Sequence, residues 1–185
     1  MRILAISGSL RDASFNTALA RAAIDQAPEG VEIELYDRLR DVPLYDDDLD
    51  GEDAPQPVRD LRSRIEEADA LLFVTPEYNG SVPGVLKNAI DWASRPPKGS
   101  AALWGKTAAV AGASTGQHGA LWAQQDLKRI LGIAGARVIE GELPVPRAHD
   151  AFDGDGRLSN RIVAERLRGH LALLVEQAAP AALAA

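Results

Sequence analysis

The chain has 185 residues and a formal net charge of −7, with 46% hydrophobic and 25% charged residues. This composition is typical of a globular protein, and we expect residues 1–185 to form a single domain. No cluster of Lys and Arg offsets the acidic balance, which argues against a nucleic-acid partner because binding a phosphate backbone needs clustered cations. The chain contains no cysteine, which excludes disulfides and thiol nucleophiles, so any redox chemistry must come from a bound cofactor.

The N-terminal residues MRILAIS are too short for a signal peptide, and no apolar run approaches the roughly 20 residues of a membrane helix. We therefore expect a cytoplasmic protein without a membrane partner. The acidic stretch that begins at Asp46 starts like a calcium-binding loop. Its twelfth position is Pro57, where such a loop needs a glutamate, so we predict no metal site.

Hydrophobic patterning predicts strands and helices that alternate along the chain. Strands are expected at residues 2–6, 31–36, 70–75, 106–113 and 136–140, and helices at residues 15–26, 58–68, 83–94, 120–134 and 159–179. Residues 37–57 are polar and contain three prolines, so they are predicted to form a loop. This alternation predicts an α/β fold with a parallel sheet covered on both faces and a ligand at the carboxyl ends of the strands.

Three loops at those strand ends are rich in Gly, Ser, Thr and Asn. They are SGSLRDASFN at residues 7–16, TPEYNGSVPG at residues 75–84 and GASTGQHG at residues 112–119. The carboxyl ends of parallel strands meet at one edge of a sheet, so three such loops together predict one ligand site.

The first loop precedes a helix, whose free N–H groups and positive dipole end favour an anion. Hydroxyls at Ser9 and Ser14, the Asn16 amide and the Arg11 guanidinium add hydrogen-bond donors suited to a phosphate. The loop has neither the glycine pattern of a dinucleotide site nor that of a nucleoside-triphosphate site. Two alternatives stay open: Ser14 acts as a helix cap, and Arg11 is an exposed surface charge.

The segments GSLRDASFN and TPEYNGSVPGVLKNAIDW, followed by a Ser/Thr/Gly loop, resemble the NADPH-dependent FMN reductase family. The resemblance extends from residue 3 to about residue 140. It implies a flavodoxin-like three-layer sandwich with a five-stranded parallel sheet of order 2-1-3-4-5. It also implies noncovalent FMN, NADPH (with NADH possible) as the electron donor, and a homodimer or homotetramer in which the helix at residues 83–94 packs against its twin.

The resemblance also implies which residues bind FMN. Around the phosphate it places Ser9, Arg11, Ser14, Phe15, Asn16 and Thr17. Along the isoalloxazine and the ribityl chain it places Pro76, Glu77, Tyr78, Asn79 and Gly80, and on the other side of the ring Ser114, Thr115 and Gly116. Some relatives carry an aromatic residue where this chain has Gly80, which predicts a more open flavin.

The expected reaction passes a hydride from the nicotinamide to FMN and then reduces a small acceptor: a quinone, free flavin, an azo compound or a metal oxyanion. Hydride transfer needs no general base, so we predict no catalytic acid or base, and we interpret His118 as a solvated loop residue. Glu77 is left either as a ligand of flavin hydroxyls or as a cap of local N–H groups. Lys87 and Asp91 are left as a pair within their helix or across an interface.

Two other functions remain open at this point. A flavodoxin-like carrier would exchange single electrons with protein partners and would have no reductase activity of its own. A domain that had lost the flavin would serve as a binding module. The motif TPEYNGSVPGVLKNAIDW argues against the first, and the three intact loops argue against the second.

Overall fold

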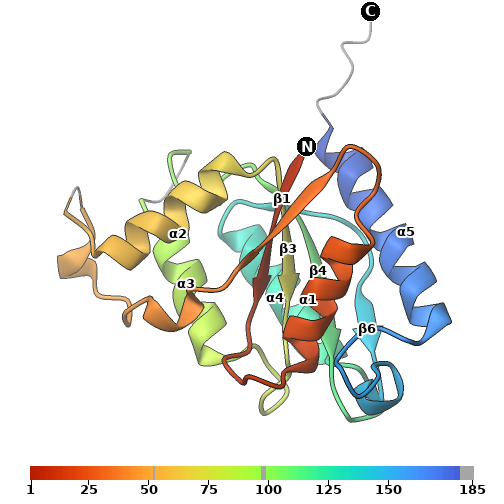
Figure 1. Cartoon of the computed structure of the whole chain (residues 1–185). Coiled ribbons are helices and arrows are strands. Elements are labelled where there is room, and N and C mark those ends of the chain that lie inside the picture. The colour runs from red at the N-terminus through yellow and green to blue at the C-terminus, as the bar shows by residue number, and fades with distance from the viewer. Residues whose placement is uncertain (52, 97–98, 180–185) are drawn as a thin grey trace, which may run out of the picture.

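The computed structural model describes residues 1–51, 53–96 and 99–179, and their core is one parallel sheet (Figure 1). Its strands follow the order β2-β1-β3-β4-β5, and a sixth strand, β6, pairs with the end of β4. This order confirms the predicted one. The bounds of the strands are β1 (Arg2–Ser7), β2 (Glu32–Tyr36), β3 (Ala70–Val74), β4 (Thr107–Ala113), β5 (Arg137–Val138) and β6 (Leu143–Val145).

Helices cover both faces of the sheet, as predicted. The first face carries α1 (Phe15–Asp25) and α5 (Arg161–Ala178), and the second carries α2 (Gln56–Glu67), α3 (Gly84–Ala93) and α4 (Leu121–Ile133). Along β1, Ile3 and Ala5 belong to the core beneath α1 and α5, whereas Leu4 and Ile6 belong to the core on the opposite face. Burial on both faces explains why the strands are almost continuously hydrophobic.

The helices agree with the predicted ranges to within two residues at each end. The largest shifts are two residues: α2 begins at Gln56 rather than at Val58, and α5 begins at Arg161 rather than at Ser159. Pro57 fits the first helical turn because that turn leaves backbone N–H groups unpaired in any case. Within the described ranges, no helix combines the length and the apolar character that crossing a bilayer would require.

The segment at residues 37–57 is more ordered than the predicted polar loop. It contains two short 3₁₀ turns, η1 (Leu39–Asp41) and η2 (Asp47–Leu49). The carbonyl oxygen of Pro43 accepts hydrogen bonds from Asn88 Nδ2 and Trp92 Nε1, both at 2.8 Å. These bonds fix the segment against α3, which sequence patterning missed because both donors lie more than 40 residues further along the chain.

The fifth strand, predicted over residues 136–140, is divided into two pieces. The chain pairs with the start of β4 as β5, turns away at Gly141 (φ +82°), and returns as β6 beside the end of β4. The carbonyl of Val110 lies at this break and meets His170 Nε2 of α5 at 2.9 Å. His170 is buried, and its burial lowers the pKa of the imidazole, so the neutral ring occupies the position of a missing sheet partner.

Candidate functional site

The loops that follow β1, β3 and β4 meet at one edge of the sheet, beside the start of α1 (Figure 1). Two backbone hydrogen bonds join the ends of the neighbouring strands, so the three loops begin next to one another. Gly8 N–H donates to the Val74 carbonyl at 2.8 Å, and Thr75 N–H donates to the Ala111 carbonyl at 2.9 Å. The structure thus brings together the three segments that the sequence predicted as one site.

Ser14 is the N-cap of α1. Its Oγ accepts hydrogen bonds from the N–H groups of Asn16 at 3.2 Å and Thr17 at 3.3 Å. The cap that the sequence left as an alternative is therefore present. In the described part of the chain, the N–H groups of Ala13, Ser14 and Phe15 have no protein acceptor. These groups lie immediately before, at and after the cap residue, and they are among the donors that an anion at a helix N-terminus uses.

Asn16 joins the first loop to the third. Its Nδ2 donates to the Ala113 carbonyl at 3.0 Å, and its Oδ1 accepts from the Ala113 N–H at 2.8 Å. The side chain is buried, and both of its polar atoms are engaged at the end of β4. Asn16, which the sequence predicted as a hydrogen-bond donor to a phosphate, thus also holds α1 against β4.

Arg11 lies on the surface but folds back on its own loop. Its Nη2 donates to the Ala13 carbonyl at 2.8 Å, and its guanidinium carbon lies 5.9 Å from the centroid of the Phe15 ring. Phe15 in turn stacks on Phe152 with ring centroids 5.7 Å apart. The guanidinium is therefore held beside the unpaired N–H groups at the start of α1. The predicted exposed charge and the predicted phosphate ligand are both compatible with this position.

The loop after β3 makes a tight turn. Tyr78 and Ser81 exchange two backbone hydrogen bonds, and the residues between them, Asn79 and Gly80, have positive φ values of 53° and 76°. An Asn-Gly pair is the sequence that such a turn favours. This conformation also explains Gly80, because any other residue would be strained there.

Two side chains fix this loop to α4. Glu77 Oε2 accepts the Ala123 N–H at 3.1 Å, so Glu77 does cap a backbone N–H group, but one on α4 that is 46 residues away rather than one in its own loop. The Ser81 hydroxyl donates to Asp126 at 2.6 Å and holds the pKa of that carboxyl below its ordinary value. Tyr78, at the tip, is 53% exposed.

The loop after β4 is held by a segment that the sequence analysis did not assign to the site. Ser114 N–H donates to the Val145 carbonyl, and the carbonyls of Ser114 and Gly116 accept from Ala148 and Arg147 at 2.9 and 3.0 Å. Within the described residues, the N–H groups of Thr115 and Gly116 have no protein acceptor. The residues that bind this loop lie about 30 positions further along the chain, and no local motif predicts the contact.

Close packing explains the glycine that ends this loop. Gly119 has a φ of +59°, and a Cβ there would lie 2.6 Å from the backbone nitrogen of Val145. His118, the preceding residue, is exposed as predicted, and its ring centroid lies 4.9 Å from that of Trp122.

The three loops together present mainly hydrogen-bond donors. Unpaired N–H groups, hydroxyls and one guanidinium surround an edge of the sheet where the strand order reverses between β1 and β3. Such a set suits a phosphate and the carbonyl oxygens and ring nitrogens of a flavin. The fold and these loops define a mononucleotide-binding α/β protein of the flavodoxin-like class.

Comparison with known proteins identifies the family. A model of the NADPH-dependent FMN reductase family matches residues 1–150. The chain is 43% identical over 175 residues to an NAD(P)H-dependent FMN reductase of Pseudomonas aeruginosa, covering 94% of this chain and 93% of the relative. It is 37% identical over 178 residues to a 2-hydroxy-1,4-benzoquinone reductase of a Burkholderia species, covering 96% and 93%.

A solved structure agrees with these relatives. FerB, a flavoenzyme NAD(P)H:(acceptor) oxidoreductase from Paracoccus denitrificans, superposes with a TM-score of 0.85 at 39% identity, covering 96% of each chain. The chain belongs to the NADPH-dependent FMN reductase family.

Proposed function

We propose that this protein oxidises NAD(P)H and reduces a small acceptor, with quinones and free flavin as the acceptor classes, and that the three loops bind the FMN that it uses. The observation that carries the proposal is that the loops after β1, β3 and β4 meet at one edge of the sheet and each carry backbone N–H groups with no protein acceptor in the described residues. Relatives named FMN reductase and quinone reductase support both acceptor classes.

In this proposal the first loop binds the FMN phosphate. The N–H groups at the start of α1 and the Arg11 guanidinium supply charge-assisted hydrogen bonds, and the Ser9 hydroxyl is exposed enough to add another. Asn16 acts by keeping the start of α1 against β4. The remaining phosphate-loop residues of the proposal are Ser14, Phe15 and Thr17.

The other two loops bind the flavin ring and its ribityl chain. The N–H groups of Asn79 and Gly80 project from a turn whose own hydrogen bonds use only Tyr78 and Ser81. The N–H groups of Thr115 and Gly116, which have no protein acceptor within the described residues, belong to the loop after β4. The proposal also includes Pro76, Glu77, Tyr78 and Ser114.

When bound, FMN supplies hydride acceptance from the nicotinamide and electron delivery to the second substrate. The protein would contribute position and electrostatics: backbone N–H dipoles would stabilise negative charge on the reduced ring, and a hydride that passes directly from the nicotinamide needs no general base. We therefore assign no catalytic acid or base.

The direct test uses the FMN-loaded protein with NADPH and 1,4-benzoquinone, and the same protein stripped of FMN as the control. We expect quinone to accelerate NADPH oxidation well above the rate with oxygen alone, and only when FMN is present. An FMN-loaded protein whose NADPH oxidation is no faster with quinone or free flavin would contradict the proposed acceptors.

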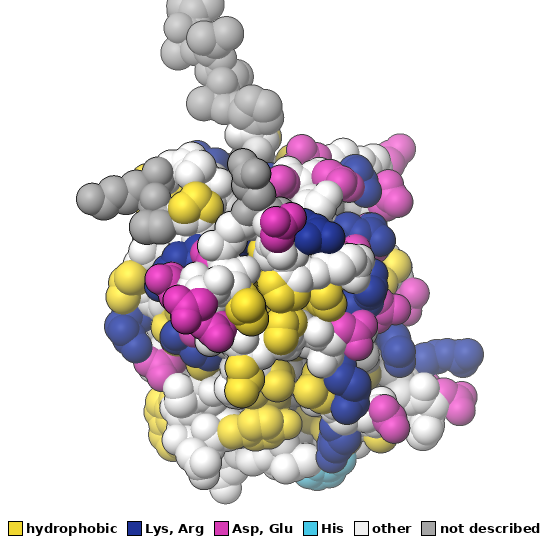
Figure 2. Space-filling model, turned by 90° about the vertical axis from the view of Figure 1, so that its left-hand side faces the viewer, with side chains coloured by type: hydrophobic (Ala, Val, Ile, Leu, Met, Phe, Trp, Pro, Cys, Tyr) yellow, Lys and Arg dark blue, Asp and Glu magenta, His cyan; other side chains and the backbone are white. Residues whose placement is uncertain are grey.

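We propose in addition that two copies associate through a groove between α3 and α4. The groove has a volume of about 490 Å³, and its lining includes Trp104 and Ile133, which are 50% and 77% exposed. Figure 2 looks onto the side that carries α2 and α3, where hydrophobic side chains gather among charged ones. Lys87 also lines the groove, and its ion pair with Asp91 at 2.7 Å lies within α3, which is one of the two alternatives left by the sequence.

Burial of large exposed apolar side chains favours association, so a charge in the groove should oppose it. We expect Ile133→Asp to shift the mass measured by light scattering from that of a dimer, or of a tetramer, to that of a smaller species. The control is Ile162→Asp, because Ile162 is 70% exposed on α5, on the other face of the sheet. A wild-type protein that is monomeric at micromolar concentration would contradict the proposal.

A further inference from the structure

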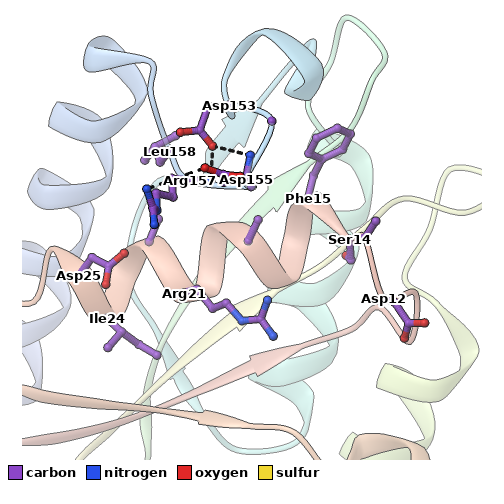
Figure 3. Close-up of a pocket in the computed structure, with 15 residues that line it drawn as sticks. Asp12, Ser14, Phe15, Arg21, Ile24, Asp25, Asp153, Asp155, Arg157 and Leu158 are labelled. Carbon is purple, nitrogen blue, oxygen red and sulfur yellow. Dashed lines mark hydrogen bonds and ion pairs between the residues drawn. The ribbon is translucent and has the colours of Figure 1, made fainter.

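Two pairs of aromatic side chains lie beside the three loops, and they differ in exposure. Phe15 and Phe152 stack on each other on the first face of the sheet, and Phe152 is buried. Phe15 also borders a cavity of about 580 Å³ between α1 and residues 153–158 (Figure 3). Four aspartates and two arginines line the same cavity. The aromatic surface of this pair is thus used within the protein, beside a strongly charged surface.

The second pair, His118 and Trp122, is exposed. Their ring centroids lie 4.9 Å apart with an angle of 36° between the ring planes, and Trp122 is 52% exposed. His118 belongs to the loop after β4, and Trp122 lies in the first turn of α4, which follows that loop. The His118–Trp122 pair therefore presents flat apolar surface to solvent at a segment that the proposed function places beside the flavin ring.

Hydrogen bonds also place this pair beside the loop after β3. Glu77 of that loop accepts the N–H of Ala123, the residue after Trp122, at 3.1 Å. Ser81 donates at 2.6 Å to Asp126, which lies one helical turn after Trp122 on the same face of α4. The side chains of a helix lean toward its N-terminus, so Trp122 projects toward the edge of the sheet where the three loops meet.

The turn that carries His118 is fixed by the protein itself. Gly119 and Ala120 have positive φ values of 59° and 60°. Gln124, which is fully buried, donates to the carbonyls of these two residues at 3.0 and 3.2 Å. Aromatic rings that are held in place before a ligand arrives lose little conformational freedom on binding it.

The neighbouring turn leaves room for such a ligand. Gly80 directly precedes Ser81, and a Cβ at Gly80 would meet no atom within 4 Å. A flat aromatic ligand gains by offset or edge-to-face contact with exposed aromatic rings. The open turn and the His118–Trp122 pair together suit the outer ring of an aromatic molecule.

We propose that the His118–Trp122 pair binds the part of an aromatic acceptor that extends beyond the flavin ring, and that it makes the enzyme favour fused-ring acceptors over single-ring quinones. A naphthoquinone or a free flavin has a further ring for this contact, whereas a benzoquinone has none. The proposal rests on the proposed function above, because it names the acceptors that the same site prefers.

The test follows reoxidation of the FMN-loaded protein in an anaerobic stopped-flow instrument, after its flavin has been reduced with dithionite. The acceptors are 1,4-naphthoquinone, 1,4-benzoquinone and ferricyanide, which has no aromatic ring. Each quinone takes two electrons from the flavin and two protons in all, and leaves as the hydroquinone.

Trp122→Ala should raise the naphthoquinone concentration for half-maximal reoxidation on the order of tenfold, the effect of losing one aromatic stack. The limiting rate should stay within about twofold, because the change removes a binding contact. Values for benzoquinone and ferricyanide should also stay within about twofold.

Two variants serve as controls. Trp122→Phe keeps an aromatic ring and should remain within about threefold of the wild type with naphthoquinone. Ile162→Ala removes another exposed apolar side chain, on the other face of the sheet, and should change none of these values.

An unchanged naphthoquinone value in Trp122→Ala would overturn the proposal. So would an equal loss with all three acceptors, because Trp122 would then act on the flavin. A smaller mass of Trp122→Ala in light scattering would overturn it as well, because the pair would then belong to a contact between copies. A failure of the proposed function is separately visible, as FMN-loaded wild type whose flavin is reduced by dithionite but by neither NADPH nor NADH.

Discussion

The site is built from two kinds of residue, which differ in what their side chains are bound to. Asn16, Glu77 and Ser81 form what we call the frame: each uses its polar atoms on another element of the protein. Arg11, Tyr78 and Thr115 form the tips: they are exposed and lie next to unpaired backbone N–H groups. The frame thus fixes where the loops lie, and the tips are available to a ligand.

This difference predicts that the two kinds of residue fail differently. A frame substitution should lower the free energy of unfolding together with cofactor affinity, because it releases a loop. A tip substitution should lower affinity and leave folding unchanged. Each variant below is therefore measured twice, by urea denaturation of the FMN-free protein and by FMN titration.

The largest effect is expected at Asn16→Ala. The change removes two hydrogen bonds and leaves the N–H and carbonyl of Ala113 buried without a partner, so unfolding should become easier by about 2–4 kcal/mol. FMN affinity should fall as well. Thr115→Ala is the matched tip control and should keep the stability of the wild type within about 0.5 kcal/mol. An Asn16→Ala protein as stable as the wild type would break the distinction between frame and tips.

An intermediate effect is expected at Arg11→Ala. The loss of a charged hydrogen bond to the phosphate should weaken FMN binding by about 1–3 kcal/mol, while the midpoint of urea denaturation stays constant. Arg161→Ala removes another exposed charge, at the start of α5, and should leave FMN affinity unchanged. Unaltered FMN affinity in Arg11→Ala would make Arg11 a surface charge without a binding role.

The smallest effect expected is a pH dependence of the free energy of unfolding that comes from His170. Like the frame residues, His170 binds another element of the protein through its side chain. Burial lowers the pKa of this imidazole in the folded protein, with Lys128 and Arg166 adding to the shift and Glu142 opposing it. The unfolded chain therefore binds more protons as the pH falls below about 6.5, and folding stability should decline there and remain level above.

His170→Gln should remove this part of the pH dependence, whereas His149→Gln, at an exposed position, should keep it. The measurement is the free energy of unfolding between pH 7 and pH 5. A wild-type stability that does not change over that interval would show that His170 makes no such contribution.

The strands and the three donor-rich loops could be predicted from the sequence because both depend on local patterns, whereas the sheet order was implied by the resemblance to the FMN reductase family. The hydrophobic strands, the donor-rich loops and the Asn79-Gly80 turn are each readable within about ten residues. The position of Ser14 before a helix likewise announces a cap.

The frame depends instead on contacts between distant segments. Asn16 and Ala113 are 97 positions apart, and His170 and Val110 are 60 apart. Ala113 and Val110 lie in a hydrophobic strand and carry no motif, and an asparagine in a phosphate loop is interpreted first as a ligand. The division of the fifth strand escaped prediction for the same reason, because β6 is defined by its pairing with β4 rather than by its three residues.

The most direct test of the whole account is an anaerobic titration of the FMN-loaded protein with NADPH, followed by visible absorption. The account predicts that protein-bound flavin loses its yellow absorbance in proportion to the NADPH added and regains it on addition of a quinone. Protein that retains FMN but keeps its absorbance with both NADPH and NADH would contradict the reductase function. Protein that retains no FMN would contradict the binding site itself.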